Sequence, residues 1–173
     1  MTGLLLLGVL GLWFAFSVFV ALKLFRFCRS DKTRLLVLVV VLAVMLPLPV
    51  ADELIAAPQF NKLCAEEAIL KFDPEKIRDR TIFRADDKHV EMTIGPLRGY
   101  YIPGRYLDAT TKAVVVTDAS YHVKGGFFIH MLGISEKDAP LTMRSYCASP
   151  ESPWQKTFLS RYNLKYIQPK DVK

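Results

Sequence analysis

The sequence lacks the short motifs that mark the commonest catalytic sites. There is no glycine-rich phosphate loop, no Gly-x-Ser-x-Gly nucleophile turn and no Cys-x-x-Cys pair. The three histidines, His89, His122 and His130, have neither the His-x-His nor the His-Glu-x-x-His spacing of a local metal site. The sequence therefore favours a protein that is not an enzyme, with no catalytic residues, no bound metal and no cofactor.

Charge is absent from two long stretches near the start of the chain, residues 3–22 and 35–50. A helix of about 20 apolar residues crosses the hydrocarbon core of a bilayer, and fewer suffice where flanking cations reach the interface. We expect both stretches to be membrane-spanning helices. Because neither contains a charged residue, histidine, asparagine or glutamine, we do not expect an ion or proton pathway through this chain alone.

The turn between the two stretches, residues 23–34, carries five cations and one acid, Asp31. The cations are Lys23, Arg26, Arg29, Lys32 and Arg34. An excess of lysine and arginine in a short loop is typical of the cytoplasmic side of a membrane. We therefore expect a two-span hairpin (residues 1–50) in a bacterial inner membrane, with both chain ends and a domain of residues 51–173 in the periplasm.

We expect both apolar stretches to stay in the chain. Residues 1–3 supply no cation for the n-region of a signal peptide. After the second stretch, Pro49 stands at the minus-three position of a possible cleavage site and disfavours cleavage.

Small residues recur at helical spacing in the first stretch, at Gly8, Gly11 and Ala15. Gly11 and Ala15 are four residues apart, a spacing that lets two helix backbones approach closely. We interpret them as a helix-packing face, either for the second stretch or for a helix of another protein. The alternative is that glycine is simply common in membrane helices.

The net charge of +6 does not indicate nucleic-acid binding. Five of the 23 cations and one of the 17 acids lie in the turn of the hairpin, which leaves 18 cations and 16 acids from residue 51 onward. Nucleic-acid binding needs clustered cations to neutralise phosphates, so we expect no nucleic-acid partner.

Two of the three cysteines, Cys64 and Cys147, lie in the part that we expect to be exported, whereas Cys28 lies in the basic turn. An oxidising compartment permits a bridge across the 83 residues that separate the pair. We predict a Cys64–Cys147 disulfide, and the alternative is two buried thiols.

The remaining sequence predicts one α+β domain, an antiparallel sheet flanked by helices. Pro103 and Gly104 indicate a bend in an edge strand, and the Lys124-Gly125-Gly126 turn predicts a hairpin of the two strands beside it. The expected helices are 52–72, with Pro58 able to open a second segment, 74–77 and 153–162. The expected strands are 81–84, 89–94, 100–107, 113–123, 127–132 and 143–147.

The last expected helix has Trp154, Phe158, Leu159 and Tyr162 on one face. This face is predicted to pack on the core of the domain. The alternative is that it lies at the lipid interface, where tryptophan and tyrosine are common.

One set of aromatic and basic residues is a candidate partner-binding surface. Tyrosine and arginine are enriched at the energetic centres of protein interfaces, and an edge strand offers unpaired backbone groups. The alternative is ordinary core and rim packing. The set consists of Arg98, Tyr100, Tyr101, Arg105 and Tyr106.

These features predict an accessory or assembly subunit of a larger inner-membrane complex, in contact with membrane lipid and with other integral membrane subunits. A second hypothesis is a stand-alone binding protein that faces the periplasm, with an immunity, exclusion or lysis-control role. A membrane-tethered enzyme is a third hypothesis, which the missing catalytic motifs disfavour.

Overall fold

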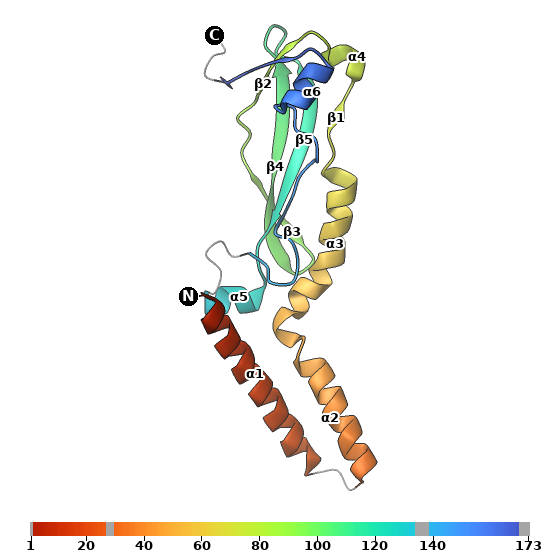
Figure 1. Cartoon of the computed structure of the whole chain (residues 1–173), viewed down its shortest axis with the longest axis vertical. Coiled ribbons are helices and arrows are strands. Elements are labelled where there is room, and N and C mark those ends of the chain that lie inside the picture. The colour runs from red at the N-terminus through yellow and green to blue at the C-terminus, as the bar shows by residue number, and fades with distance from the viewer. Residues whose placement is uncertain (1, 27–29, 134–138, 170–173) are drawn as a thin grey trace.

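The computed structural model describes residues 2–26, 30–133 and 139–169 of the chain, an α+β structure with a mixed sheet (Figure 1). The helices are α1 (Thr2–Phe25), α2 (Asp31–Met45), the 3-10 turn η1 (Leu48–Val50), α3 (Ala51–Glu67), α4 (Pro74–Ile77), α5 (Phe127–Leu132) and α6 (Lys156–Arg161). The strands are β1 (Lys71–Phe72), β2 (Thr81–Arg84), β3 (Val90–Ile94), β4 (Leu97–Asp108), β5 (Val114–Val123), β6 (Tyr146–Cys147) and β7 (Lys165–Ile167). The C-terminal end of α1 and the turn between β4 and β5 lie at opposite ends of the elongated molecule (Figure 1).

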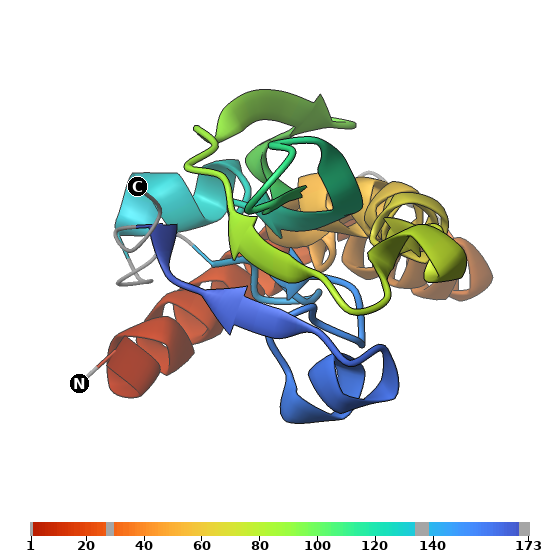
Figure 2. The same cartoon turned by 90° about the horizontal axis from the view of Figure 1, so that it is seen from above.

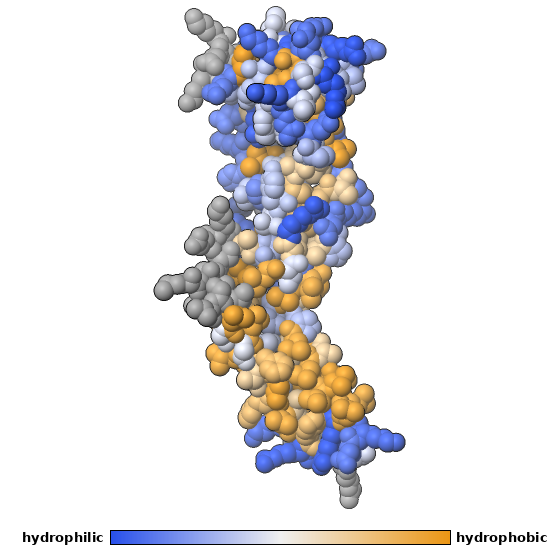
Figure 3. All heavy atoms as spheres, in the orientation of Figure 1, coloured by the Kyte–Doolittle hydropathy of each residue, from blue (hydrophilic) through white to orange (hydrophobic). Residues whose placement is uncertain are grey.

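Two N-terminal helical segments, Leu7–Phe25 and Asp31–Glu67, are long and apolar enough to cross a membrane, by length and composition alone. No residue of α2 is buried in the isolated chain. The hairpin therefore presents an apolar outer surface, with its charged residues at the turn (Figure 3).

One hydrogen bond joins α1 to the end of α2. The indole Nε1 of Trp13 donates to the carbonyl oxygen of Met45 at 2.8 Å. In a continuous helix that carbonyl would accept from residue 49, but Pro49 has no N–H to donate. The tryptophan thus supplies the donor that the proline removes, which matters most where no water is present.

Helix α3 is continuous from Ala51 to Glu67 and passes through Pro58, so the expected second segment does not form. Its buried residues follow a helical period: Glu53, Ala56, Phe60 and Cys64. The helix ends earlier than expected, because Lys71 and Phe72 pair with β5 as a short strand.

The sheet has the strand order β1-β5-β4-β2-β7, with β3 paired to β4 and β6 paired to β5. All pairs are antiparallel except β2 and β7, which are parallel. The expectation of a purely antiparallel sheet is therefore wrong in this one pair. Figure 2 looks along the molecule with β2, β7 and α6 nearest the viewer and the hairpin helices behind them.

The two core clusters lie on opposite faces of the β4–β5 hairpin, because neighbouring residues of a strand point to opposite sides. Tyr121 and Val123 of β5 pack with Phe60 of α3 in one cluster. Val116 of β5 packs with Phe158 of α6 in the other cluster. Helix α6 covers only the end of its face that is remote from α1 and α2 (Figure 1).

Strand β4 is an interior strand, so the predicted edge strand is wrong. It pairs with β5 along one side, and with β3 and then β2 along the other. The partner β3 reaches to Tyr101 and β2 starts at Tyr106. Pro103 lies in the gap between these partners, where a missing N–H breaks no ladder.

Residues 127–132 form helix α5, and the predicted strand is wrong. The place beside β5 is taken by β6, whose residues pair with Tyr121 and His122. The N–H of Phe127 instead donates to Asp52 of α3 at 2.7 Å, and Gly133 ends the helix in the left-handed conformation (φ 58°). A short apolar run without a period suits a strand or a helix, and here these contacts favour the helix.

The C-terminal helix begins later than expected, at Lys156, and buries Phe158. Leu159 and Tyr162 pack against the same cluster. Trp154 precedes the helix and is 48% exposed, so its predicted place in the core is wrong. Helix α6 also lies at the end of the molecule remote from α1 and α2 (Figure 1), so the lipid-interface alternative gains no support.

Candidate functional site

Four aromatic side chains form a ladder across the open part of the sheet, and we call them the aromatic ladder: His89, Tyr100, His122 and Tyr146. Tyr100 and His122 are register partners and stack with ring centroids 4.6 Å apart and planes 8° from parallel. His89 meets Tyr100 edge-on at 5.6 Å, and Tyr146 lies 4.7 Å from His122. The order of neighbouring strands thus places one ring beside the next.

The ladder is accessible because α6 covers the same face only further along β4 and β5. Tyr100 and His122 are half-buried, and Tyr146 is 48% exposed. A groove of about 830 Å³ borders the His89 and Tyr100 end, with Arg98, Lys124 and Glu91 in its lining. This end therefore combines aromatic faces with charges of both signs.

A smaller pocket of about 400 Å³ borders the Tyr146 end of the ladder. Its lining includes Trp154, the guanidinium groups of Arg84 and Arg144, and the carboxyl group of Asp118. Aromatic faces with arginines beside them can stack on a partner's planar groups and pair with its carboxylates. The whole face is thus suited to recognition.

Burial sets the electrostatics of this face. It lowers the pKa of His122, so the imidazole of the ladder favours its neutral form. It also raises the pKa of Asp118, an effect that the charge of Arg84 partly offsets. Asp118 leans over Gly104, where an added Cβ would lie only 1.6 Å from its Oδ1, so a larger residue there would displace the Asp118 carboxyl group.

The predicted partner-binding set does not form one surface. Arg98 and Tyr100 face the open side with the ladder, whereas Tyr101 points to the opposite side and stacks on Tyr121. Arg105 donates from both Nε and Nη2 to the carboxylate of Asp87. The remaining member is Tyr106.

Tyr106 is fully buried between Val116 and Phe158, so its predicted role at a partner surface is wrong. Burial raises the pKa of its hydroxyl group. Tyr100 and Tyr106 point to the same side of β4, but only Tyr106 lies where α6 covers that side. On this side of the sheet, the residues that α6 covers are therefore core and those beyond α6 are surface.

The ladder contains three residues that the predicted surface did not include, His89, His122 and Tyr146. The sequence shows the alternation of each strand but not which strands are neighbours. One sequence feature pointed toward the ladder: His122 and Tyr100 lie in two long strands of alternating residues. The register of those strands, which makes the two residues partners, could not be predicted from the sequence.

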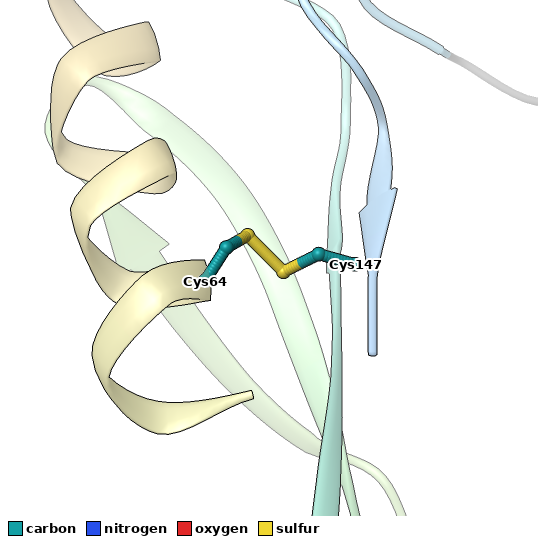
Figure 4. The surroundings of a disulfide bond; sticks show 2 residues. All are labelled: Cys64 and Cys147. Atoms are coloured by element: carbon teal, nitrogen blue, oxygen red, sulfur yellow. A yellow bond between two sulfur atoms is a disulfide. The ribbon is translucent and has the colours of Figure 1, made fainter. Parts of the chain in front are cut away.

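Cys64 and Cys147 are joined as a disulfide in the structure, in agreement with the predicted pair (Figure 4). The bridge links α3 to β6, and their Cα atoms are 6.0 Å apart. Because β6 has only two residues, the covalent link to α3 helps to keep it beside β5. The bridge therefore fixes the position of Tyr146, the residue before Cys147.

The predicted packing face of α1 does not contact α2. Gly8, Gly11 and Ala15 are exposed, and an added Cβ at either glycine would meet open space. Ser17 and Ala21 are buried instead, on the side of α1 that carries the Trp13 bond to Met45. The first alternative, packing on the second stretch, is therefore wrong.

Four of the five predicted topology residues lie at the turn of the hairpin, far from the sheet. Arg34 pairs with Asp31 at 3.1 Å, and the ammonium group of Lys23 lies over the Phe19 ring. Arg26 and Lys32 are exposed. Arg29 lies outside the described residues.

An acidic pair at the start of α3 joins this helix to two later segments of the domain, and no local sequence pattern indicates these contacts. Glu53 is buried, and its carboxylate accepts from the N–H groups of Leu141 (2.9 Å) and Thr142 (2.8 Å) and from the Thr142 hydroxyl. Asp52 binds the N–H of Phe127. These acids fix α5 and the segment at residue 141 against the base of α3.

Among the described residues, no group of three or more histidine, cysteine and acidic side chains is placed to hold a metal ion. Comparisons with protein-family models, with curated proteins and with solved structures find no match. The functional argument therefore depends on the geometry of this chain.

Proposed function

We propose that this chain is a non-enzymatic accessory or assembly subunit of a larger bacterial inner-membrane complex, and that its C-terminal domain is a periplasmic protein-interaction module. The observation that carries the proposal is the aromatic ladder, an open surface on a domain whose first helix continues from an apolar hairpin. A domain held in this way presents the ladder at a fixed place relative to the hairpin.

The composition of the ladder face suits a protein partner. Tyrosine, tryptophan and arginine give large binding contributions at interfaces because they combine apolar area with a polar group. Here Tyr100 and Tyr146 are flanked by Arg98, Arg144 and Trp154. Half-buried rings that already stack on one another lose little conformational freedom when a partner covers them.

The hairpin supports the same proposal. The predicted packing face of α1 points away from α2, with Gly8, Gly11 and Ala15 exposed. This face is therefore free to pack against a helix of another membrane protein, the second of the two predicted alternatives. Packing against such a helix would cover a flat strip of α1 that the chain itself leaves exposed.

The orientation in the membrane is part of the proposal. The cations of the turn favour a cytoplasmic turn, which places the ladder and the disulfide in the periplasm, where disulfides persist. A fusion after Lys173 of a reporter enzyme that is active only outside the cytoplasm tests this orientation. We expect activity, and a reporter that works only in the cytoplasm would contradict the proposal.

Purification of the tagged full chain in a mild detergent tests the interaction role. We expect membrane proteins to co-purify in fixed stoichiometry with the wild-type chain. The double variant Tyr100→Ala/His122→Ala should lose them, because it removes the central stacked pair of the ladder. The matched control is Ile69→Ala/Val114→Ala, which truncates two exposed side chains elsewhere and should retain the partners.

Two outcomes would contradict the proposal. If the wild-type chain purifies alone or as a homo-oligomer, the stand-alone binding protein replaces the accessory subunit. If the ladder variant folds and retains every partner, the ladder is not the interaction surface.

A further inference from the structure

Helix α5 has a buried apolar side, and its exposed side carries two large apolar residues together with His130. Phe128 and Ile129 point inward and are almost fully buried, whereas Phe127 is 75% exposed and Met131 is 62% exposed. Phe127 and Met131 are four residues apart, so they project from one side of the helix. A contiguous apolar patch that is exposed to solvent often marks a binding site for a protein partner or a membrane.

The exposed side of α5 borders a groove of about 730 Å³. The opposite wall belongs to α1, with Leu12, Trp13 and Phe16 in its lining. The floor includes Leu48 and Pro49 from the end of the second apolar stretch. The groove is therefore shared between the hairpin and the domain.

The acid in the lining, Asp52, uses both of its carboxylate oxygens in hydrogen bonds to backbone N–H groups. Its Oδ2 accepts from the N–H of Phe127 at 2.7 Å, and its Oδ1 accepts from the N–H of Glu53. At Gly126 an added Cβ would lie 2.1 Å from Asp52, so the glycine lets the carboxylate approach the start of α5. Helix α5 is thus bound to Asp52, two residues after the end of the second apolar stretch.

The apolar surface continues from the hairpin to α5. Leu12 and Phe16 are exposed on α1 beside the groove, and Leu48 is exposed where the hairpin meets the domain. On the face shown in Figure 3, hydrophobic residues cover most of the hairpin and reach the lower part of the domain, while hydrophilic residues lie at the hairpin turn and over much of the rest of the domain. Among the described residues that line the groove between α1 and α5, Asp52 is the one charged residue.

We propose that α5 lies in the bilayer that α1 and α2 cross, with Phe127 and Met131 in its hydrocarbon edge and lipid acyl chains in the groove between α5 and α1. The inference rests on the membrane-spanning hairpin of the proposed function. Apolar side chains that enter the boundary between headgroups and acyl chains hold a protein segment at the membrane surface. The domain then has a third membrane contact, and the ladder has a defined height above the lipid.

Quenching by labelled lipid tests this contact in the full chain. In a Cys28→Ser background that keeps the disulfide, single cysteines are introduced as Phe127→Cys and Met131→Cys and labelled with nitrobenzoxadiazole. The protein is reconstituted into phosphatidylcholine nanodiscs without nitroxide, or with a nitroxide on either the upper or the lower part of the acyl chain. Phe14→Cys, on the exposed side of α1, is the control inside the expected span, and Val114→Cys is the control on the remote tip of β5.

We expect at least one nitroxide lipid to lower the fluorescence of labels at 127, 131 and 14 by about twofold or more, and neither to change the label at 114. Quenching at 14 without quenching at both 127 and 131 would overturn the inference and leave the hairpin intact. Labels at 127 and 131 that are shielded from water but not quenched would show a protein occupant, which also overturns it. No quenching at 14 would instead reject the membrane hairpin on which the proposed function rests.

Discussion

The two faces of the β4–β5 hairpin use neighbouring aromatic pairs in opposite ways. Tyr101 stacks on Tyr121 beneath α3 and beside the disulfide, whereas Tyr100 stacks on His122 on the open side. Both pairs are formed by directly opposed residues of the same two strands. One pair helps to hold the domain together, and the other is available to a partner.

Alternation along a strand determines to which side of the sheet an aromatic residue points. Whether that residue is core or surface depends on which element covers that side. Tyr100 and Tyr101 are neighbours in sequence but differ in role because they point to opposite sides. Tyr100 and Tyr106 point to the same side but differ because α6 covers only the second. We therefore expect substitutions on the covered face to change stability, and substitutions in the ladder to change binding.

The largest loss of stability is expected from removal of the disulfide, which joins α3 to β6 on the face of the sheet that α3 covers. The variant Cys64→Ser/Cys147→Ser should lose about 4 kcal/mol of unfolding free energy, because the bridge closes a long loop of the unfolded chain. Urea unfolding of the full chain in detergent micelles measures the loss. Cys28→Ser is the control and should change nothing, and an equally stable double variant would contradict the prediction.

The stacked pairs themselves give the next effect. Tyr121→Ala should cost about 3 kcal/mol because it leaves a cavity between α3 and β6. His122→Ala, the next residue on the open side, should cost less than about 1 kcal/mol. The same urea titration compares them, and equal losses would remove the distinction between the two faces.

The base of the covered face depends on the buried Glu53. Glu53→Ala should cost about 2 kcal/mol, because the N–H groups of Leu141 and Thr142 lose a buried acceptor. Glu66→Ala, at an exposed position of the same helix, is the matched control and should change stability little. Amide hydrogen exchange at residues 141 and 142 should rise only in the Glu53 variant, and unchanged exchange there would count against this role.

A smaller effect of opposite sign is expected at Tyr106. Its hydroxyl is buried and has no hydrogen-bond partner among the residues that the structure describes. Tyr106→Phe keeps the packing and removes the unpaired polar group, so it should raise stability by up to about 1 kcal/mol. A clear loss of stability in thermal unfolding would mean that the hydroxyl has a partner.

The smallest effect is a pH dependence from the open face. Burial holds the pKa of His122 below its ordinary value of 6.5, so the unfolded chain binds that proton more readily than the folded chain. The stability that neutral His122 contributes is present above pH 6.5 and is lost as the pH falls through 6.5 toward the folded-state pKa. His122→Gln should flatten the unfolding free energy over this range, and an unchanged slope would contradict the assignment.

The sequence predicted the parts of the fold that local patterns control. The helical spacing of Phe60, Leu63 and Cys64 indicated α3 and its buried side, and the strand pattern from residue 113 to 123 indicated β5. The apolar stretches at the start of the chain likewise indicated two helices long enough to cross a membrane. Each of these features can be predicted without knowing which distant residues will contact it.

The missed features all depend on contacts between distant residues. The run Phe127-Phe-Ile-His-Met-Leu132 has no period, and its helix is fixed by Asp52, 75 residues earlier. The parallel β7 and the interior position of β4 follow from strand order, which alternation does not encode. The ladder likewise needs the register of β3, β4, β5 and β6 together, so only Arg98 and Tyr100 of the predicted set lie on its face.

The central claim is that the open face of the β4–β5 hairpin is where the chain meets its partners. The most direct test places a photo-crosslinking amino acid in living cells at Tyr146 of the ladder, or at Val114 on the remote tip of β5, positions that are 48% and 47% exposed. Our account predicts a discrete crosslinked membrane protein from position 146 and none from position 114. Crosslinks of equal yield from both positions, or from 114 alone, would contradict it.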